Sequence, residues 1–340
     1  MNNEPSRNPN NDARQAETLQ EDYRRITAEI GKRIVGQDQV VDLVVLTLLV
    51  GGNSLLMGVP GLAKTLLVQT VAETLELKFS RVQFTPDLMP SDITGTDLVQ
   101  EDPETGRRKL VFLEGPVFAN IVLADEINRT PPKTQSALLE AMQERRVTVQ
   151  GKTYPLPRPF FVFATQNPIE LEGTYPLPEA QLDRFMFEIV LDYLPEEEEL
   201  AVIRTTTAVA EQTLEPIIDG ERLLAYQQLV RQVPLAEEVA RHALALVRAT
   251  RPGKGGLGFA EQWLAYGASV RAAQYIVLAA KARALTRGRL HVGFEDIRAM
   301  ARPVLRHRLL RNFHAESERI SVDDIVDQLL TGVAVPRRLV

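Results

Sequence analysis

The sequence contains no cysteine and only four histidines, and each shortage removes a class of functional site. Without cysteine the chain can form neither disulfides nor thiolate metal sites, and it has no cysteine nucleophile. The histidines all lie in the last third of the chain, and none has zinc-protease spacing; they are His242, His291, His307 and His314. The lack of cysteine fits a reducing compartment, and we expect a cytoplasmic location.

Long apolar runs are also missing. The longest, residues 40–50, contains Asp42 and ends at a pair of glycines, so it is too short to span a bilayer and predicts a buried helix. No signal peptide is visible, because residues 1–17 are polar and rich in Asn and Pro. We expect this segment to be a disordered tail, and we expect no membrane insertion.

The net charge of −6 gives no broad attraction to nucleic acid, and no nucleic-acid partner is expected. The charge is unevenly placed, since residues 221–340 are rich in Lys and Arg while the rest of the chain carries the excess of Asp and Glu. The acidic and basic parts could face each other, within a subunit or between neighbours, or the basic part could contact an acidic partner. The first interpretation is favoured because the basic residues are spread along predicted helices.

The most informative segment is residues 58–65, Gly-Val-Pro-Gly-Leu-Ala-Lys-Thr. It follows a predicted strand at 53–57 and precedes a helical pattern at 66–75. Glycines allow backbone N–H groups to face phosphate oxygens, and a helix start adds partial positive charge. We expect Lys64 to reach the β- and γ-phosphates of a nucleotide and the Thr65 hydroxyl to bind Mg²⁺.

Ala63 stands where the pattern G-x-x-x-x-G-K-[ST] has its last glycine. Because Ala tolerates helical dihedrals, we expect the helix to start there, and only a positive φ would be costly. A strand, turn and helix with incidental glycines is the structural alternative. Upstream, residues 34–38 contain Gly36, which predicts a break before a new helix. This loop could lie over an adenine base, although a plain helix–helix connection has the same pattern.

Two further predicted strands end in polar residues. Residues 121–125 are apolar up to Asp125 and Glu126, and residues 160–165 precede Asn167. Ligands bind at the carboxyl ends of parallel strands. Asp125 is placed to hold Mg²⁺ through water, Glu126 to orient and deprotonate an attacking water, and Asn167 to hydrogen-bond that water or the γ-phosphate. A solvated turn and an ordinary Asn-Pro turn are the alternatives.

The remaining pattern predicts a core interrupted by insertions and followed by helices. Further strands are expected at 78–83 and 187–191, and a helix at 135–145. Two hairpins are expected, 96–100 with 108–113, and 146–150 with 153–156, the second joined by Gly151-Lys152 in a type II′ turn. The predicted helices of the C-terminal part are 221–232, 235–250, 269–286, 294–310 and 322–331. We expect a core at 18–193, a connecting helix and linker at 194–220, and a helical domain at 221–340.

The sequence resembles the AAA+ ATPases, and among them the MoxR family, from about residue 30 nearly to the C-terminus. The motifs are Gly-Val-Pro-Gly-Leu-Ala-Lys-Thr at 58–65, Ala-Asp-Glu-Ile-Asn-Arg at 124–129, Ala-Thr-Gln-Asn-Pro at 164–168, Leu-Asp-Arg-Phe at 182–185 and Gly-Ala-Ser-Val-Arg-Ala at 267–272. An Ala at position 63 is itself typical of this family. The resemblance implies an α/β fold: a P-loop NTPase αβα sandwich with a parallel five-stranded sheet, two β-hairpin insertions and an all-α lid.

The resemblance also implies roles for single residues. Lys64 and Thr65 match Walker A, Asp125 and Glu126 match Walker B, and Asn167 matches sensor 1. Arg184 matches the arginine finger, which acts on nucleotide held by the neighbouring subunit, although a structural pairing with Asp183 is the alternative. Arg271 matches sensor 2, beside Val270 where the family often has proline; Val removes rigidity but no chemical group. The implied nucleotide contacts are Val35, Gly36, Gly58, Pro60, Gly61, Leu62, Ala63, Lys64, Thr65, Leu66 and Arg271.

The implied function is that of an ATP-hydrolysing ring, a homo-hexamer with shared sites that uses ATP and Mg²⁺. MoxR proteins are expected to act as chaperone-like remodellers or activators of clients, often with von Willebrand factor A-domain partners, in metal-cofactor insertion or complex maturation. A nucleic-acid motor is an alternative, but the second hairpin offers little beyond Arg145, Arg146 and Lys152. A nucleotide-switched scaffold is another, against which the intact Glu126 and Arg184 argue.

Overall fold

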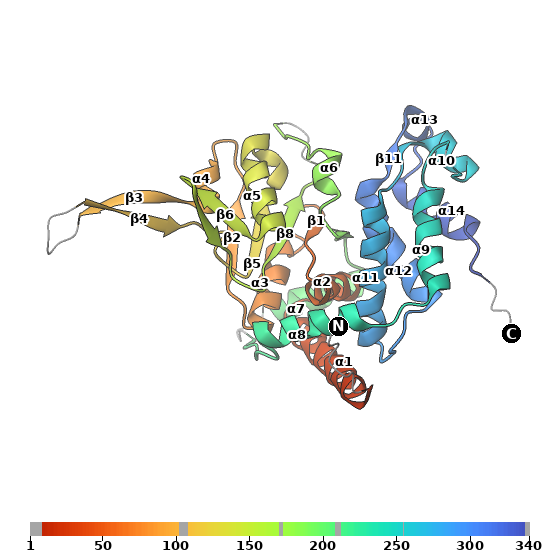
Figure 1. Cartoon of the computed structure of the whole chain (residues 1–340), viewed down its shortest axis with the longest axis horizontal. Helices are drawn as coiled ribbons and strands as arrows, with labels where there is room; N and C mark the ends of the chain where they lie inside the picture. The colour runs from red at the N-terminus through yellow and green to blue at the C-terminus, as the bar shows by residue number, and fades with distance from the viewer. Residues whose placement is uncertain (1–8, 102–107, 170–172, 208–211, 254, 337–340) are drawn as a thin grey trace, which may run out of the picture. The chain divides into compact units, whose positions relative to one another are not determined.

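The computed structural model describes residues 9–101, 108–169, 173–207, 212–253 and 255–336 (Figure 1). The chain divides into two compact units. Residues 29–44 and 51–221 form what we call the core unit, and residues 1–28, 45–50 and 222–340 form the helical unit. Residues 18–28, which the sequence placed in the core, therefore belong to the helical unit.

The core unit is built on a five-stranded parallel sheet, as predicted, and the strand order is β2-β5-β8-β1-β9. The strands are β1 (Ser54–Met57), β2 (Phe79–Gln83), β5 (Ile121–Asp125), β8 (Phe161–Gln166) and β9 (Phe187–Val190). Every residue of β5 is buried, which explains its continuous apolar run, since a central parallel strand is covered on both faces. In the parallel register Ala124 of β5 lies opposite Ala164 of β8, so the carboxyl ends of these strands meet at one edge.

Helices cover the sheet and complete an αβα sandwich. The longer helices of the core unit are α2 (Asp38–Val50, shared with the helical unit), α3 (Lys64–Thr74), α5 (Pro132–Glu144) and α7 (Glu196–Thr206); the shorter ones are α4 (Pro90–Thr94), η1 (Ile127–Arg129) and α6 (Glu179–Leu182). The apolar side of α5 packs Leu138 and Met142 into a cluster with Val122 and Val162 of the sheet. Helix α3 follows β1, and β1 runs parallel to β8. The start of α3 therefore lies at the same edge of the sheet as the carboxyl ends of β5 and β8.

Two antiparallel hairpins interrupt the βα repeat, as predicted. The first pairs β3 (Gly95–Glu101) with β4 (Arg108–Glu114), and we call it the ribbon; the second pairs β6 (Arg146–Val149) with β7 (Lys152–Pro155). Figure 1 shows the ribbon projecting from the sheet. The predicted polar connection of the ribbon lies largely outside the described residues. At the base, the ring of Phe112 stacks on Tyr154 with centroids 4.0 Å apart, which joins the two hairpins.

The turn of the second hairpin differs from the prediction. Val149 pairs with Lys152, so the connecting residues are Gln150 and Gly151 and not Gly151-Lys152. Both have positive φ, 48° and 80°, which is the pattern of a type I′ turn and not of type II′. A type I′ turn matches the right-handed twist of the strands, and here it places a residue other than glycine or asparagine in left-handed backbone.

The helical unit contains the predicted C-terminal helices and some elements that were not predicted. The helix expected at 294–310 ends at Leu305, so the predicted end of that helix is wrong. Its main helices are α1 (Pro9–Gly31), α8 (Gly220–Gln232), α9 (Glu237–Ala249), α11 (Val270–Thr286), α12 (Phe294–Leu305) and α14 (Val322–Gly332). The part of α1 up to Ala28 belongs to this unit, and the rest belongs to the core unit. The additions are α10 (Gly258–Trp263), η2 (Arg306–Arg308), α13 (Phe313–Ser317) and a short antiparallel pair, β10 (Leu264–Tyr266) with β11 (Leu310–Arg311). Such two- and three-residue strands carry no alternation that a sequence pattern could detect.

The predicted disordered tail at 1–17 is wrong for residues 9–17, because α1 begins at Pro9. Ala16 and Leu19 are buried, so the apolar side of the helix extends into this polar segment. Pro9 occupies the helix start, where the missing N–H is tolerated. Residues 1–8 lie outside the described residues. Among the described helices, none has the length and apolar composition needed to cross a bilayer.

Candidate functional site

The glycine loop between β1 and α3 forms the floor of the site. Gly58 passes so close to β9 that a Cβ there would lie 2.9 Å from the carbonyl oxygen of Leu191. Ala63 adopts left-handed backbone, with φ 56° and ψ 22°, and α3 begins only at Lys64. The expectation that the helix starts at Ala63 without strain is therefore wrong. Left-handed backbone costs a residue with a Cβ about 1–2 kcal/mol, so the loop holds Ala63 against its preference.

Lys64 lies folded over this loop. Its Nζ donates to the carbonyl oxygens of Gly58 at 2.6 Å and Val59 at 2.9 Å. The pKa of Lys64 lies below its ordinary value because burial penalises the charge more than the nearby carboxylates of Asp125 and Glu126 favour it. The ammonium is therefore a partly desolvated cation at the loop, a suitable partner for an anionic group that enters there.

Asp125, at the end of β5, is only 8% exposed and uses both carboxylate oxygens. Oδ1 accepts from the hydroxyl of Thr165 at 2.6 Å, and Oδ2 accepts from Arg81 Nη2 at 2.6 Å and Nε at 3.0 Å. Thr165 also accepts from the backbone N–H of Glu126 at 2.8 Å. The parallel alignment of β5 with β8 thus brings the two predicted acids beside the strand that leads to Asn167.

Glu126 follows directly in left-handed backbone, with φ 57° and ψ 49°. Its carboxylate oxygen Oε2 accepts from Gln83 Nε2 at 3.0 Å and pairs with Arg129 Nε at 2.9 Å. A solvated turn does not account for this arrangement, because the side chain is three-quarters buried and doubly held. Non-glycine residues in strained backbone concentrate at functional sites.

Arg81, Gln83 and Arg129 contact the two acids and were not predicted to belong to the site. The sequence did indicate that Arg81 and Gln83 share a face, since they are two residues apart on a predicted strand. In the structure Gln83 lies opposite Asp125 in the register of β2 with β5. Sequence alone could not supply that register.

Asn167 follows β8 and is 6% exposed. Its Oδ1 accepts from the N–H of Ile169 at 3.2 Å, which is the local turn contact that an Asn-Pro sequence predicts. Its Nδ2, however, is buried and has no hydrogen-bond partner among the described residues. A buried donor left unpaired costs about 1–3 kcal/mol. The unpaired amide therefore points to a ligand acceptor in the adjoining cavity.

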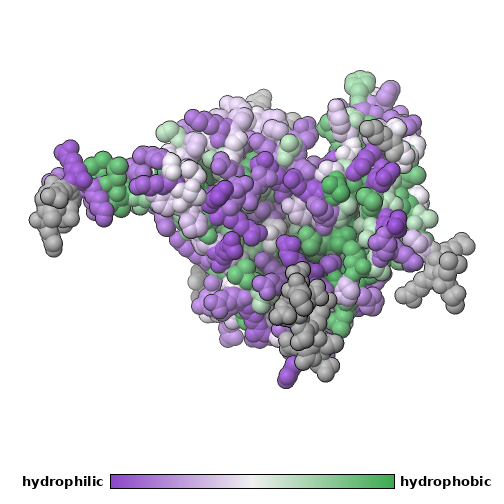
Figure 2. All heavy atoms as spheres, viewed as in Figure 1, coloured by the Kyte–Doolittle hydropathy of each residue, from purple (hydrophilic) through white to green (hydrophobic). Residues whose placement is uncertain are grey.

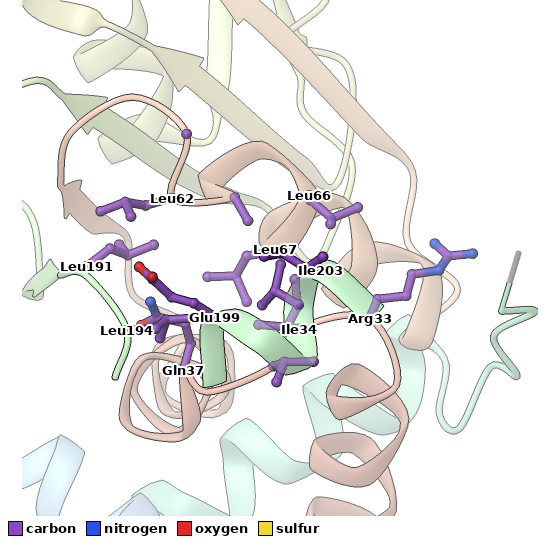
Figure 3. A pocket seen from close by; sticks show the side chains of 14 residues that line it. Arg33, Ile34, Gln37, Leu62, Leu66, Leu67, Leu191, Leu194, Glu199 and Ile203 are labelled. Carbon is purple, nitrogen blue, oxygen red and sulfur yellow. The ribbon is translucent and has the colours of Figure 1, made fainter. Parts of the chain in front are cut away.

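Two cavities in the core unit meet at the glycine loop. The polar cavity, of about 430 Å³, is lined by the loop from Pro60 to Leu66 and by Arg81, Asp125, Glu126, Thr165, Gln166 and Asn167. The apolar cavity, of about 320 Å³, is lined by Arg33, Ile34, Val35, Gln37, Gly61, Leu62, Ala63, Leu66, Leu67, Leu191, Leu194, Glu199, Val202 and Ile203. Figure 3 shows Leu62, Leu66 and Ile203 around the apolar cavity. A ligand with a flat apolar group joined to a polyanion fits such a pair of cavities.

The polar cavity offers few protein oxygens to a divalent metal. Among the described residues, no group of three or more His, Asp or Glu side chains could hold an ion. The Thr65 hydroxyl and the Asp125 carboxylate line the polar cavity together, and both are oxygen donors. Mg²⁺ binds through one or two protein oxygens, water and substrate phosphates, so this donor set fits Mg²⁺ accompanied by a phosphate ligand.

Two of the predicted site residues belong to other elements. Arg184 follows α6 (Glu179–Leu182), is half-buried, and is not among the residues that line either cavity. Arg271 belongs to the helical unit, in the first turn of α11, where its N–H donates to the capping Oγ of Ser269 at 3.2 Å. Gly36, with φ 75°, forms the turn before α2, and its neighbour Val35 lines the apolar cavity. The roles of Arg184 and Arg271 stay predictions.

Comparisons with known proteins agree with this geometry. Residues 53–187 match the family model "ATPase family associated with various cellular activities (AAA)", and residues 259–329 match an AAA lid domain. Chaperone MoxR1 of Mycobacterium tuberculosis is 45% identical over 92% of this chain and 82% of its own length. Protein MoxR of Methylorubrum extorquens is 30% identical over 96% of this chain and all of its own length. A crystal structure from Cytophaga hutchinsonii superimposes with a TM-score of 0.87 at 43% identity, covering 95% of this chain and 98% of that one.

Proposed function

Because the chain belongs to the MoxR family of AAA+ ATPases, we propose that it binds ATP with Mg²⁺ and hydrolyses it to ADP and phosphate. The observation that carries this proposal is the convergence of Lys64, Glu126 and the unpaired Nδ2 of Asn167 on one polar cavity. Each comes from a different element, and an apolar cavity of suitable size for a base adjoins it.

The two cavities divide the nucleotide between them. The adenine base lies in the apolar cavity between Val35, Leu66 and Ile203, and the phosphates lie over the glycine loop. On binding, Lys64 exchanges its contacts with the Gly58 and Val59 carbonyls for phosphate oxygens. Thr65 and Asp125 would hold Mg²⁺, which neutralises phosphate charge when bound.

Glu126 and Asn167 act on the attacking water. The Glu126 carboxylate orients the water and takes its proton, while Nδ2 of Asn167 donates to the water or to a γ-phosphate oxygen. Gln83 and Arg129 hold the carboxylate at one oxygen, so Oε1 is the atom left to face the water. Arg184 adds positive charge to the site of a neighbouring subunit in a homo-hexamer, because phosphoryl transfer is strongly accelerated by such an arginine.

The energy of hydrolysis drives a chaperone-like role. The proposed location of the protein is the cytoplasm. Supporting the chaperone-like role, two relatives are named Chaperone MoxR1 and Protein MoxR. The ribbon offers a contact surface, because it exposes Leu98, Val99, Leu110 and Leu113 (Figures 1 and 2). Exposed aliphatic patches on monomers mark interaction sites. The proposed clients are proteins that receive a metal cofactor or complexes that are being matured. The proposed partner is a von Willebrand factor A-domain protein.

A Glu126→Gln variant tests both parts of this proposal. Removing the base while keeping the shape should leave ATP binding intact and lower hydrolysis at least ~100-fold. Such a trapped variant should retain clients that a Lys64→Ala variant, unable to bind ATP, does not retain. Mass spectrometry of the co-purifying proteins identifies them. Unchanged hydrolysis by Glu126→Gln would contradict the catalytic assignment, and recovery of DNA or replication proteins would contradict the client assignment.

A further inference from the structure

Arg81 is the one cation on the edge strand β2 that reaches the polar cavity. Its guanidinium places both Nε and Nη2 on a single oxygen of Asp125, Oδ2, at 3.0 and 2.6 Å. Nη2 also donates to Oε1 of Gln83 at 2.9 Å, which fixes the plane of the group. With Thr165 on Oδ1, both oxygens of the proposed metal-holding carboxylate are taken by donors of the chain itself.

An ion at Asp125 must compete with this arrangement. The Asp125 side chain is 12% exposed and that of Arg81 is 48% exposed, so the pair is partly shielded from solvent and stronger than a surface pair. Mg²⁺ loses its bound water at a high cost in free energy, and one carboxylate with one hydroxyl replaces only a small part of its coordination shell.

Phosphate oxygens change the balance. They add ligands to the ion and negative charge to the cavity, and Arg81 lines that same cavity beside the glycine loop. A guanidinium displaced from Asp125 therefore stays close to the phosphates, where it can form charge-assisted hydrogen bonds. The half-exposed side chain has room for this movement.

We propose that Arg81 is an internal competitor for the metal ion at Asp125, so that the ion enters only together with nucleotide phosphates. Arg81 acts through Asp125 and is a positioning residue. The inference rests on the proposed nucleotide function of this site. It assigns to Arg81 a positive coupling between metal and nucleotide, which is reciprocal, since each ligand must raise the affinity of the other by the same factor.

The test measures metal binding directly. Mn²⁺ replaces Mg²⁺ as a paramagnetic probe, and its binding to the whole protein is followed by electron paramagnetic resonance, without nucleotide and with a saturating non-hydrolysable ATP analogue. In Arg81→Ala, affinity for Mn²⁺ without nucleotide should rise about tenfold, on the order of a partly shielded ion pair. The gain in affinity on adding the analogue should shrink by the same factor.

Two further variants keep the test decisive. Arg81→Gln retains a hydrogen-bond donor for Asp125 and should show the same change if the truncated variant does not fold. Arg146→Gln removes an equal charge from the core unit at a residue that pairs with Glu144 and lines neither cavity, and it should leave both affinities unchanged. Unchanged or weaker Mn²⁺ binding in both Arg81 variants would overturn the inference. Failure of the unmodified protein to bind the analogue would instead overturn the proposed function.

Discussion

Single residues in this site are held in arrangements that a ligand-independent fold would not favour. Ala63 and Glu126 both adopt left-handed backbone, and Nδ2 of Asn167 is buried without a hydrogen-bond acceptor among the described residues. Each costs on the order of 1–3 kcal/mol. All three lie at the rim of one polar cavity, so the strain coincides with the proposed chemistry.

Asn167→Ala should separate catalysis from stability. Loss of a positioned donor lowers hydrolysis roughly 10²-fold with ATP binding retained. The free energy of unfolding stays within about 1 kcal/mol, because removal of the unpaired Nδ2 offsets the loss of the contact from Ile169 N–H to Oδ1. The comparison variant is Asn120→Ala, whose amide is paired at both ends, with Lys78 N and Pro159 O. It should lose stability and keep its hydrolysis rate. Equal loss of ATP binding and hydrolysis in Asn167→Ala would identify a purely structural asparagine.

Lys64 should make stability depend on alkaline pH. Its pKa in the folded protein is lowered by burial, so the folded state disfavours the charged form. Below that pKa the charge costs stability, and the cost disappears as pH rises through the folded pKa towards the unfolded value of about 10.4. Lys64→Met should therefore be more stable than the wild type at neutral pH, with the difference shrinking near pH ~10. Denaturant unfolding without nucleotide measures this, and the exposed Lys152→Met should show no such trend.

At the scale of elements, the sequence predicts most of the sheet but not its local geometry. Strands β5 and β8 are continuous apolar runs with polar ends, and such runs are sufficient to place Asp125, Glu126 and Asn167 at one edge. The alternation of residues 96–100 and 108–113 predicts the ribbon, whereas the order of the strands in the sheet was not predicted. The register that brings Arg81 and Gln83 to the acids depends on pairing between distant segments, which no local pattern contains.

The sequence predictions that were wrong for α1, Ala63 and the second hairpin turn each have a local physical cause. The start of α1 at Pro9 depends on the burial of Ala16 and Leu19, which a polar composition conceals. Ala63 adopts the conformation that glycine prefers because the loop requires it. The position of the second turn depends on which residues pair, and Gly151 alone is compatible with either type of turn.

The type I′ turn gives a prediction for Gln150. Asn-Gly is the preferred type I′ pair, so Gln150→Asn should raise the free energy of unfolding by about 0.5–1 kcal/mol, part of the cost of left-handed backbone. The effect should be visible in global unfolding because Val147 of this hairpin is buried in the core cluster. Gln150→Val, with a branched side chain, should destabilise instead. Stabilisation by valine in denaturant titrations would exclude a type I′ turn.

At the scale of the whole molecule, the core unit holds the proposed general base, metal-binding and phosphate-binding groups. Arg184 also belongs to the core unit but does not line either of its two cavities. We propose that a second copy completes this site. Closed rings repeat one heterologous contact between neighbours, so each copy can donate an arginine to the next. In the proposed ring, hydrolysis depends on assembly.

The most direct measurement mixes two inactive variants. Arg184→Ala should bind ATP but not hydrolyse it, and Lys64→Ala should do neither, although it still carries Arg184. In a random one-to-one mixture, about a quarter of the sites combine an intact glycine loop with an intact neighbouring arginine, so hydrolysis should recover to about that fraction of the wild-type rate. Normal hydrolysis by Arg184→Ala alone at every protein concentration, or a mixture that stays inactive, would contradict a site shared between subunits.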